Sequence, residues 1–338
     1  MKRSYLDWNA TAPLRPEARA AMSAAMDVVG NPSSVHAEGR AARAIVERAR
    51  AQLAEAIGAS GADIVFTGSA TEAAALALAG QGFCSPGFEH DCVLAWTDGK
   101  TTAEPAKTAW QQANGETGVI HDLPAGLGFS DAVQAIGKIP YGFAWSGVER
   151  AIVSGHKFGG PKGVGALVIR QGVEVRAALK GGGQEMGRRA GTENVIGIAG
   201  MGAAAKAALK DLEDGVWQRV EQTRNAFEAQ LLNAVPELLI FGKDAPRLPN
   251  TSYFAVPGWK AQTQVMQMDL AGFAISAGAA CSSGKVRASK ALRAMGYDEI
   301  TAGSAIRVSI GPRTTAEELE AFAMAWLKEY NRFKARAA

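Results

Sequence analysis

Residues 154–165 read Ser-Gly-His-Lys-Phe-Gly-Gly-Pro-Lys-Gly-Val-Gly and lie between two short apolar runs, 151–153 and 166–169. Each run is typical of a buried strand, and the glycines let the backbone between them turn sharply. Lys157 therefore lies at a strand end, where lost solvation can lower its pKa and make its amine an imine-forming group. The alternative is an exposed lysine on a glycine-rich turn. A P-loop is excluded, because no GxxxxGK[ST] pattern is present.

Strands alternate with helices over the first two thirds of the chain. Helices are expected at 13–28 and 37–57, and the stretch 89–94 is expected to lead into a buried strand. This alternation predicts an α/β fold with a mostly parallel sheet, followed by a smaller α+β unit. A chain of 338 residues that is 47% hydrophobic is long enough for two domains.

Composition excludes several classes of function. A net charge of +3 does not indicate a nucleic-acid partner, and every apolar run is too short to span a membrane. The N-terminus has no apolar segment of the kind found in signal peptides. Three cysteines, Cys84, Cys92 and Cys281, predict reduced thiols in the cytoplasm. Neither CxxC nor HExxH occurs, so no metal site is predicted.

Polar side chains follow several of the predicted strands. The turn at 67–72 precedes a helix, so backbone N–H groups and the helix dipole predict an anion site there. Thr71 is alternatively no more than the N-cap of that helix. His90 is either a structural histidine or a ring that stacks on a planar ligand. Asp131 and Gln134 place an acid and an amide three residues apart.

In the order and spacing of its motifs, the chain resembles the cysteine desulfurases, which are pyridoxal-phosphate (PLP) enzymes of the class V aminotransferase group. The resemblance runs from Tyr5 to the terminal helix. The motifs that carry it are GNPSSVH (30–36), TGSATE (67–72), EH (89–90), DAVQAIGK (131–138), SGHK (154–157), RAGT (189–192), GAACSSG (278–284) and IRVSIG (306–311).

The resemblance implies a PLP-dependent transferase of fold-type I. A large PLP-binding domain with a mostly parallel sheet is expected at 14–212. A small α+β domain is expected to hold both ends of the chain, residues 1–13 and 213–338.

The resemblance also implies a role for each polar residue around the cofactor ring. Lys157 is expected to hold PLP as an imine and then to act as the proton shuttle. Asp131 is expected to face the pyridine nitrogen, which keeps the ring an electron sink. Gln134 is expected to bond the phenolic oxygen, and His90 to stack on the ring as a catalytic group.

For the cofactor phosphate, the resemblance implies a site at the turn that follows the 64–66 strand. Ala70 and Thr71 are expected to bind the phosphate together with Ser154 and His156. Thr192 resembles the residue that this family contributes from a second subunit, which implies a homodimer.

For the substrate, the resemblance implies L-cysteine, with Arg307 as the bidentate partner of its carboxylate. Cys281 lies in a loop of small residues and is expected to take the substrate sulfur as a persulfide, leaving L-alanine. A sulfur-acceptor or scaffold protein is the expected partner, in iron–sulfur cluster or other sulfur-cofactor assembly. Cys84 and Cys92 match no motif and are expected to be core thiols.

Two features differ from the family pattern. Gly115 replaces the second residue of the usual Asn-Asn-Glu motif. Only 23 residues separate His90 from Asn114, and 16 separate Asn114 from Asp131. We therefore expect the large domain to lack a strand–helix unit in the first interval and a crossover helix in the second.

Two other functions are compatible with the same residues. One is a related PLP-dependent lyase or aminotransferase that acts on another small amino acid. The other is a non-catalytic PLP-binding scaffold for sulfur-carrier partners. Sulfur transfer to Cys281 distinguishes the predicted desulfurase from both.

Overall fold

A computed structural model describes residues 3–278 and 288–337, which form two compact units. The larger unit comprises Thr11–Ala113 and His121–Asp214, and the smaller comprises Met1–Ala10, Asn114–Ile120 and Gly215–Ala338. The predicted domain boundaries differ from this division mainly at 114–120. The prediction places this segment in the large domain, whereas in the structure it belongs to the smaller unit. None of the described helices combines the length and the apolar character needed to cross a membrane.

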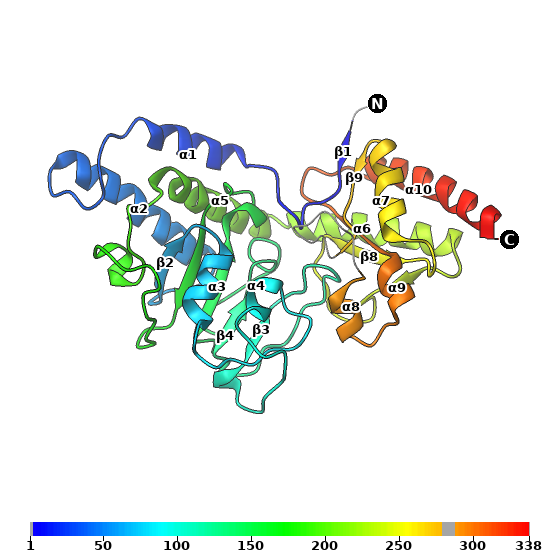
Figure 1. Ribbon diagram of the computed structural model, residues 1–338. Helices are drawn as coiled ribbons and strands as arrows, with labels where there is room; N and C mark the ends of the chain where they lie inside the picture. The colour runs from blue at the N-terminus through cyan, green and yellow to red at the C-terminus, as the bar shows by residue number, and fades with distance from the viewer. Residues whose placement is uncertain (1–2, 279–287, 338) are drawn as a thin grey trace. The chain divides into compact units, whose positions relative to one another are not determined.

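A five-stranded sheet forms the centre of the larger unit (Figure 1). In spatial order the strands are β2 (Asp63–Thr67), β6 (Gly165–Ile169), β5 (Arg150–Ser154), β4 (Phe129–Asp131) and β3 (Ala109–Gln111). Strand β6 is antiparallel to both of its neighbours, β2 and β5, whereas β3, β4 and β5 are mutually parallel. Four strands therefore point the same way, and the predicted α/β fold with a mostly parallel sheet is confirmed.

Helices cover both faces of this sheet because strand residues alternate between the faces. Ile64 and Phe66 pack with one helical layer, and Val65 between them packs with the other. A Cβ added at Gly202 would lie 2.5 Å from the Cα of Ala49, so the two helices that carry these residues pack too closely for a side chain at position 202. The first layer is α1 (Pro16–Met26), α2 (Ala37–Ala56) and α5 (Val195–Glu213), and the second includes α3 (Ala70–Leu78) and α4 (Asp91–Leu94).

The predicted strand after Glu89 is wrong, because Asp91–Leu94 forms the short helix α4. His90 caps this helix, and its Nδ1 accepts the N–H of Cys92 at 3.1 Å. A short apolar run fits a buried strand and a buried helical turn equally well. Here the bond from the Cys92 N–H to His90 caps the first turn and favours the helix.

The interval between α4 and β4 holds little regular structure, in agreement with its short length. Its described residues contain only the 3₁₀ turn η1 (Pro105–Lys107) and the strand β3. Parallel strands usually need a helical crossover of a dozen or more residues. No helix lies in residues 112–128, all of which are described, and part of that connection belongs to the smaller unit.

The smaller unit is built on an antiparallel sheet, β10–β8–β7, with a separate parallel pair, β1 and β9. Trp326 and Phe322 of the last helix are fully buried, as the apolar face of that helix predicts. The described helices and strands of the smaller unit are β1 (Ser4–Tyr5), α6 (Val216–Ala234), β7 (Leu239–Ile240), β8 (Thr251–Ala255), α7 (Ala261–Leu270), β9 (Phe273–Ala274), α8 (Lys290–Ala294), α9 (Glu299–Ser304), β10 (Ala305–Ser309) and α10 (Ala316–Ala337).

The segment 114–120 is held to the smaller unit by backbone bonds. Ile120 N donates to Pro246 O at 2.8 Å, and Leu248 N donates to Gly118 O at 2.7 Å. Arg247, between Pro246 and Leu248 in the sequence, makes a bidentate ion pair with Glu228 of α6, with N···O distances of 2.8 and 2.9 Å. Both side chains are more than nine-tenths buried, so neither charge is compensated by water.

We expect Glu228→Ala to lower the free energy of unfolding by about 3–5 kcal/mol, because it leaves Arg247 buried and unpaired. Lys243→Ala is the matched control, since its ion pair with Asp244 is largely exposed and the loss should stay within about 0.5 kcal/mol. Urea unfolding followed by circular dichroism measures both. A Glu228→Ala loss no greater than that of the control would contradict a structural role for the pair.

Candidate active site

The carboxyl ends of β2, β4 and β5 lie at one edge of the central sheet, because the three strands point the same way. The turn 67–72 follows β2, the segment 131–134 follows β4, and the lysine turn 154–157 follows β5. In open α/β sheets this edge is where ligands bind. The fold thus gathers three polar segments that are far apart in the sequence.

Lys157 ends the 3₁₀ turn η2 (Gly155–Lys157), which begins directly after β5. Backbone bonds fix this turn: Gly155 N donates to Val164 O at 3.1 Å, and Gly160 N donates to Gly155 O at 2.8 Å. Lys157 is only partly exposed. The amine therefore lies on a rigid turn at the sheet edge, and not on a flexible exposed loop.

Asp131 is the last residue of β4 and is buried. Its Oδ1 accepts the N–H of Val133 at 2.9 Å. Burial raises the pKa of this carboxyl, and the positive charges of His90 and Lys157 oppose the rise. A buried carboxylate is stable only with a hydrogen-bonded or cationic partner, so Asp131 suits a protonated ring nitrogen.

Gln134 is buried one turn after Asp131, and its Oε1 accepts a bond from Lys138 Nζ at 2.5 Å. The donors of an amide are on its nitrogen, so a ligand oxygen would bond to Gln134 through Nε2. Lys138 was not predicted as a site residue. The sequence signals for this contact are its i,i+4 spacing from Gln134 and its place at the end of the motif 131–138.

His90 has an exposed ring whose Nδ1 lies 3.0 Å from Cys92 Sγ and accepts the Cys92 N–H. Because Nδ1 is an acceptor, a neutral His90 ring carries its proton on Nε2. Burial, together with the charge of Asp131, raises the pKa of Cys92 to about 12. Cys92 is thus a buried thiol, as expected, whereas Cys84 is half-buried.

The turn after β2 starts α3, and Ser69 is its N-cap, with Oγ accepting the N–H of Glu72 at 3.1 Å. Thr71 is therefore not the cap but the second residue of the helix. The N–H groups of Ala70 and Thr71 are in the first turn, where no carbonyl of the helix can reach them. Gly165 begins β6 against this turn, where a Cβ would fall 2.6 Å from the carbonyl carbon of Ser69.

Ser154 and His156 flank the same edge. Ser154 is buried at the end of β5, and His156 Nδ1 lies 3.2 Å from Thr11 Oγ1. Burial, together with the positive charges of three lysines, lowers the pKa of His156 to about 4. His156 is therefore neutral at pH 7. The lysines that act on it are Lys157, Lys162 and Lys138.

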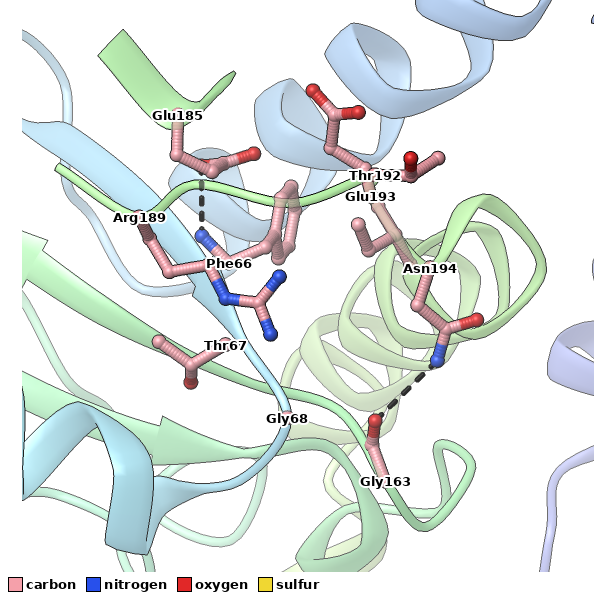
Figure 2. Close-up of a pocket in the computed structure, with 10 residues that line it drawn as sticks. Phe66, Thr67, Gly68, Gly163, Glu185, Arg189, Thr192, Glu193 and Asn194 are labelled. Carbon is pink, nitrogen blue, oxygen red and sulfur yellow. Dashed lines mark hydrogen bonds between the residues drawn. The ribbon is translucent and has the colours of Figure 1, made fainter. Parts of the chain in front are cut away.

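Thr192 is exposed in the loop that precedes α5. It lines a pocket of about 150 Å³ together with Thr67, Gly68 and Arg189 (Figure 2). The structure thus places Thr192 near the turn after β2 of its own chain. The expectation that it serves a second subunit stays a prediction.

Arg307 lies in β10 of the smaller unit and is buried. Its Nη2 donates to Asp7 Oδ1 at 2.8 Å, and its Nη1 donates to Gly115 O at 2.8 Å. Its buried Nε has no partner among the described residues. Arg307 thus keeps a donor for a further acceptor. The carbonyl oxygen of Gly115 accepts one of its bonds, at the position where the family has an asparagine.

Cys281, the expected persulfide residue, lies outside the described residues.

No group of three or more histidine, cysteine or acidic side chains in the described part of the chain could hold a metal ion. The groups that the structure places at the sheet edge are an amine, a buried carboxylate, an amide and a helix N-terminus.

Comparison with known proteins identifies the family. The model of the class-V aminotransferases matches residues 4–121 and 108–322, in two pieces that overlap where the chain is short. The cysteine desulfurase of Cereibacter sphaeroides is 38% identical over 367 aligned positions, which cover 95% of this chain and 94% of the relative. The cysteine desulfurase IscS of Dictyoglomus turgidum is 34% identical, with coverages of 94% and 92%.

A solved structure gives the same result. The NifS-like protein from Rickettsia africae superposes with a TM-score of 0.87 at 29% identity, covering 97% of this chain and 99% of that one. The match in sequence and in fold extends over nearly the whole length of both proteins. The chain therefore belongs to the class-V aminotransferase family, among its cysteine desulfurases.

Proposed function

We propose that this protein is a PLP-dependent enzyme that converts L-cysteine to L-alanine and transfers the sulfur to Cys281 as a persulfide. The observation that carries the proposal is the set of groups at one sheet edge. An amine (Lys157), a buried carboxylate (Asp131) and the N-terminus of α3 lie there together. These are the groups needed to hold an aldehyde, a ring nitrogen and a phosphate.

The residues at this edge fit PLP on physical grounds. Asp131 is buried, and burial raises the pKa of its carboxyl. A protonated pyridine nitrogen would favour the ionised form of this carboxyl. The amides of Ala70 and Thr71 suit a phosphate, since a helix N-terminus favours an anion. The Nε2 group of Gln134 suits the phenolic oxygen, and the exposed ring of His90 is available for stacking.

When bound, PLP supplies an electron sink for the substrate carbon. Lys157 would hold the cofactor covalently and, once displaced by the amine of the substrate, move the proton at the α-carbon. Asp131 would keep a proton at the pyridine nitrogen. His90, whose Nδ1 accepts the Cys92 N–H, would stack on the ring.

Arg307 would bind the carboxylate of L-cysteine. Asp7 and Gly115 O hold its guanidinium in place, which pre-organises the remaining donors. Its Nε–H, buried without a partner among the described residues, is stabilised when an acceptor arrives.

Sulfur transfer would then proceed by thiolate attack. The sulfur of Cys281 forms an S–S bond with the sulfur of the substrate, whose bond to Cβ breaks. The electron pair of that bond goes to Cβ, which takes up a proton and becomes the methyl group of alanine. A thiol of a sulfur-acceptor protein would later remove the outer sulfur, so that Cys281 is regenerated.

We propose further that the protein acts as a homodimer in the cytoplasm. Cys84 and Cys92 are both free thiols, as expected in a reducing compartment. The exposure of Thr192 is compatible with a role in the site of a second subunit.

Borohydride reduction of the purified protein should attach the pyridoxyl group to Lys157, because this lysine lies on the rigid turn at the sheet edge. Peptide mapping by mass spectrometry locates the label. Lys157→Ala should lack the visible absorbance of the imine, whereas Lys162→Ala, which alters an exposed lysine of the same loop, should stay yellow. A label on Lys138 or Lys162 would contradict the assignment.

Arg307→Lys should reduce kcat/KM for L-cysteine by roughly 10- to 150-fold, which corresponds to the loss of one charge-assisted contact of about 1.5–3 kcal/mol. Lysine cannot reproduce the planar fork of donors. Steady-state alanine formation measures the effect, and Arg313→Lys, at an exposed position, is the control. An unchanged kcat/KM would exclude Arg307 from substrate binding.

Cys281→Ala should separate cofactor binding from sulfur transfer. The variant should keep the colour of bound PLP, because Lys157 and Asp131 are unchanged, and it should form neither alanine nor protein persulfide. Amino-acid analysis and persulfide labelling measure the two products. Alanine formation at the parent rate would contradict the proposed nucleophile.

A further inference from the structure

Two carboxylates hold the backbone at the end of β2, and each is paired with an arginine. Glu185 accepts the N–H of Phe66 at 2.8 Å and binds Arg50 through two bonds at 2.9 and 3.0 Å. The bond from Phe66 to Glu185 is visible in Figure 2. Glu72 accepts the N–H of Gly68 at 2.7 Å and binds Arg189 Nε at 2.8 Å.

The loop that supplies Glu185 and Arg189 is held in an unfavourable backbone conformation. Glu185 and Met186 have φ values of 47° and 58°, in the left-handed region that side chains other than glycine rarely adopt. The burial of Glu185 between Arg50 and Phe66 N offsets this strain. The loop, with the short turn η3 (Gln184–Gly187), is thereby fixed against the end of β2.

Glu72 creates an electrostatic conflict at the proposed phosphate site. It is the third residue of α3, next to the N–H groups of Ala70 and Thr71 that would receive the phosphate. An uncompensated carboxylate there would repel a phosphate dianion. The Glu72 side chain is about three-quarters buried, so solvent screens its charge only in part.

Arg189 removes this conflict. Its guanidinium neutralises Glu72 Oε1, while Oε2 continues to accept the bond from Gly68. Figure 2 shows Arg189 projecting toward Gly68 and Thr67 across the pocket. Glu72 thus holds the backbone of the turn through Gly68, while Arg189 neutralises its negative charge.

We propose that Arg189 is a positioning residue for the phosphate-binding turn, acting through Glu72 and not by contact with the phosphate. This inference rests on the proposed PLP function and assigns to Arg189 a part of the affinity for the phosphate of the cofactor. It also explains why an acidic residue is tolerated in the first turn of an anion-binding helix.

The test compares two ligands that differ only in the phosphate. The full-length protein is freed of cofactor with hydroxylamine and titrated with PLP or with pyridoxal, and imine absorbance gives the two dissociation constants. Arg189→Met should weaken PLP binding about tenfold or more, because Glu72 then faces the phosphate uncompensated. Pyridoxal binding should change less than about twofold.

The double variant Glu72→Gln with Arg189→Met should recover PLP affinity to within about threefold of the parent, since glutamine can still accept from Gly68 but carries no charge. Arg188→Met is the matched control. Arg188 lies in the same loop and pairs with Asp63 at 2.7 Å, at the opposite end of β2. Its loss should leave both affinities unchanged.

Each result that differs from these has a definite meaning. Unchanged PLP affinity in Arg189→Met, or an equal loss for PLP and pyridoxal, would overturn the inference. A double variant as weak as the single one would also overturn it, because Arg189 would then contact the phosphate directly. Parent protein that fails to bind PLP at all would instead overturn the proposed function on which the inference rests.

Discussion

The common direction of β2, β4 and β5 is the constraint on which the site depends. Because their carboxyl ends meet at one edge, residues sixty positions apart, such as Thr71 and Asp131, follow strands that end at the same edge of the sheet. β6 runs the other way and brings Gly165 against Ser69, at a distance that admits no side chain. Reversal of any of the three parallel strands would carry its polar segment to the far edge.

Charge balance shapes the same edge. Burial raises the pKa of Asp131, and burial together with nearby lysine charges lowers the pKa of His156. A buried carboxylate needs a hydrogen-bonded or cationic partner, which a protonated ring nitrogen would supply. The pairing of Glu72 with Arg189 follows the opposite principle, since there the protein cancels a charge that would hinder the ligand.

The shortened interval changes how the parallel sheet is connected. The segment Asn114–Ile120 belongs to the smaller unit, so the connection between β3 and β4 is anchored there and not by a covering helix. An alignment of 367 positions with the Cereibacter relative exceeds the 338 residues of this chain, so the relative carries residues that this chain lacks. The segment Asn114–Ile120 also carries Gly115, whose carbonyl oxygen accepts the bond from Arg307.

The sequence by itself determined the fold class and the main polar groups of the edge. Short apolar runs and glycine punctuation are local signals, and the order of the motifs singled out Lys157 and Asp131 without any structure. Only the tertiary structure decided that 91–94 is helical, that Ser69 and not Thr71 is the cap, that Lys138 contacts Gln134 and that Arg189 contacts Glu72. Those outcomes depend on hydrogen bonds and ion pairs, some between segments more than a hundred residues apart, and no local pattern encodes such long-range contacts.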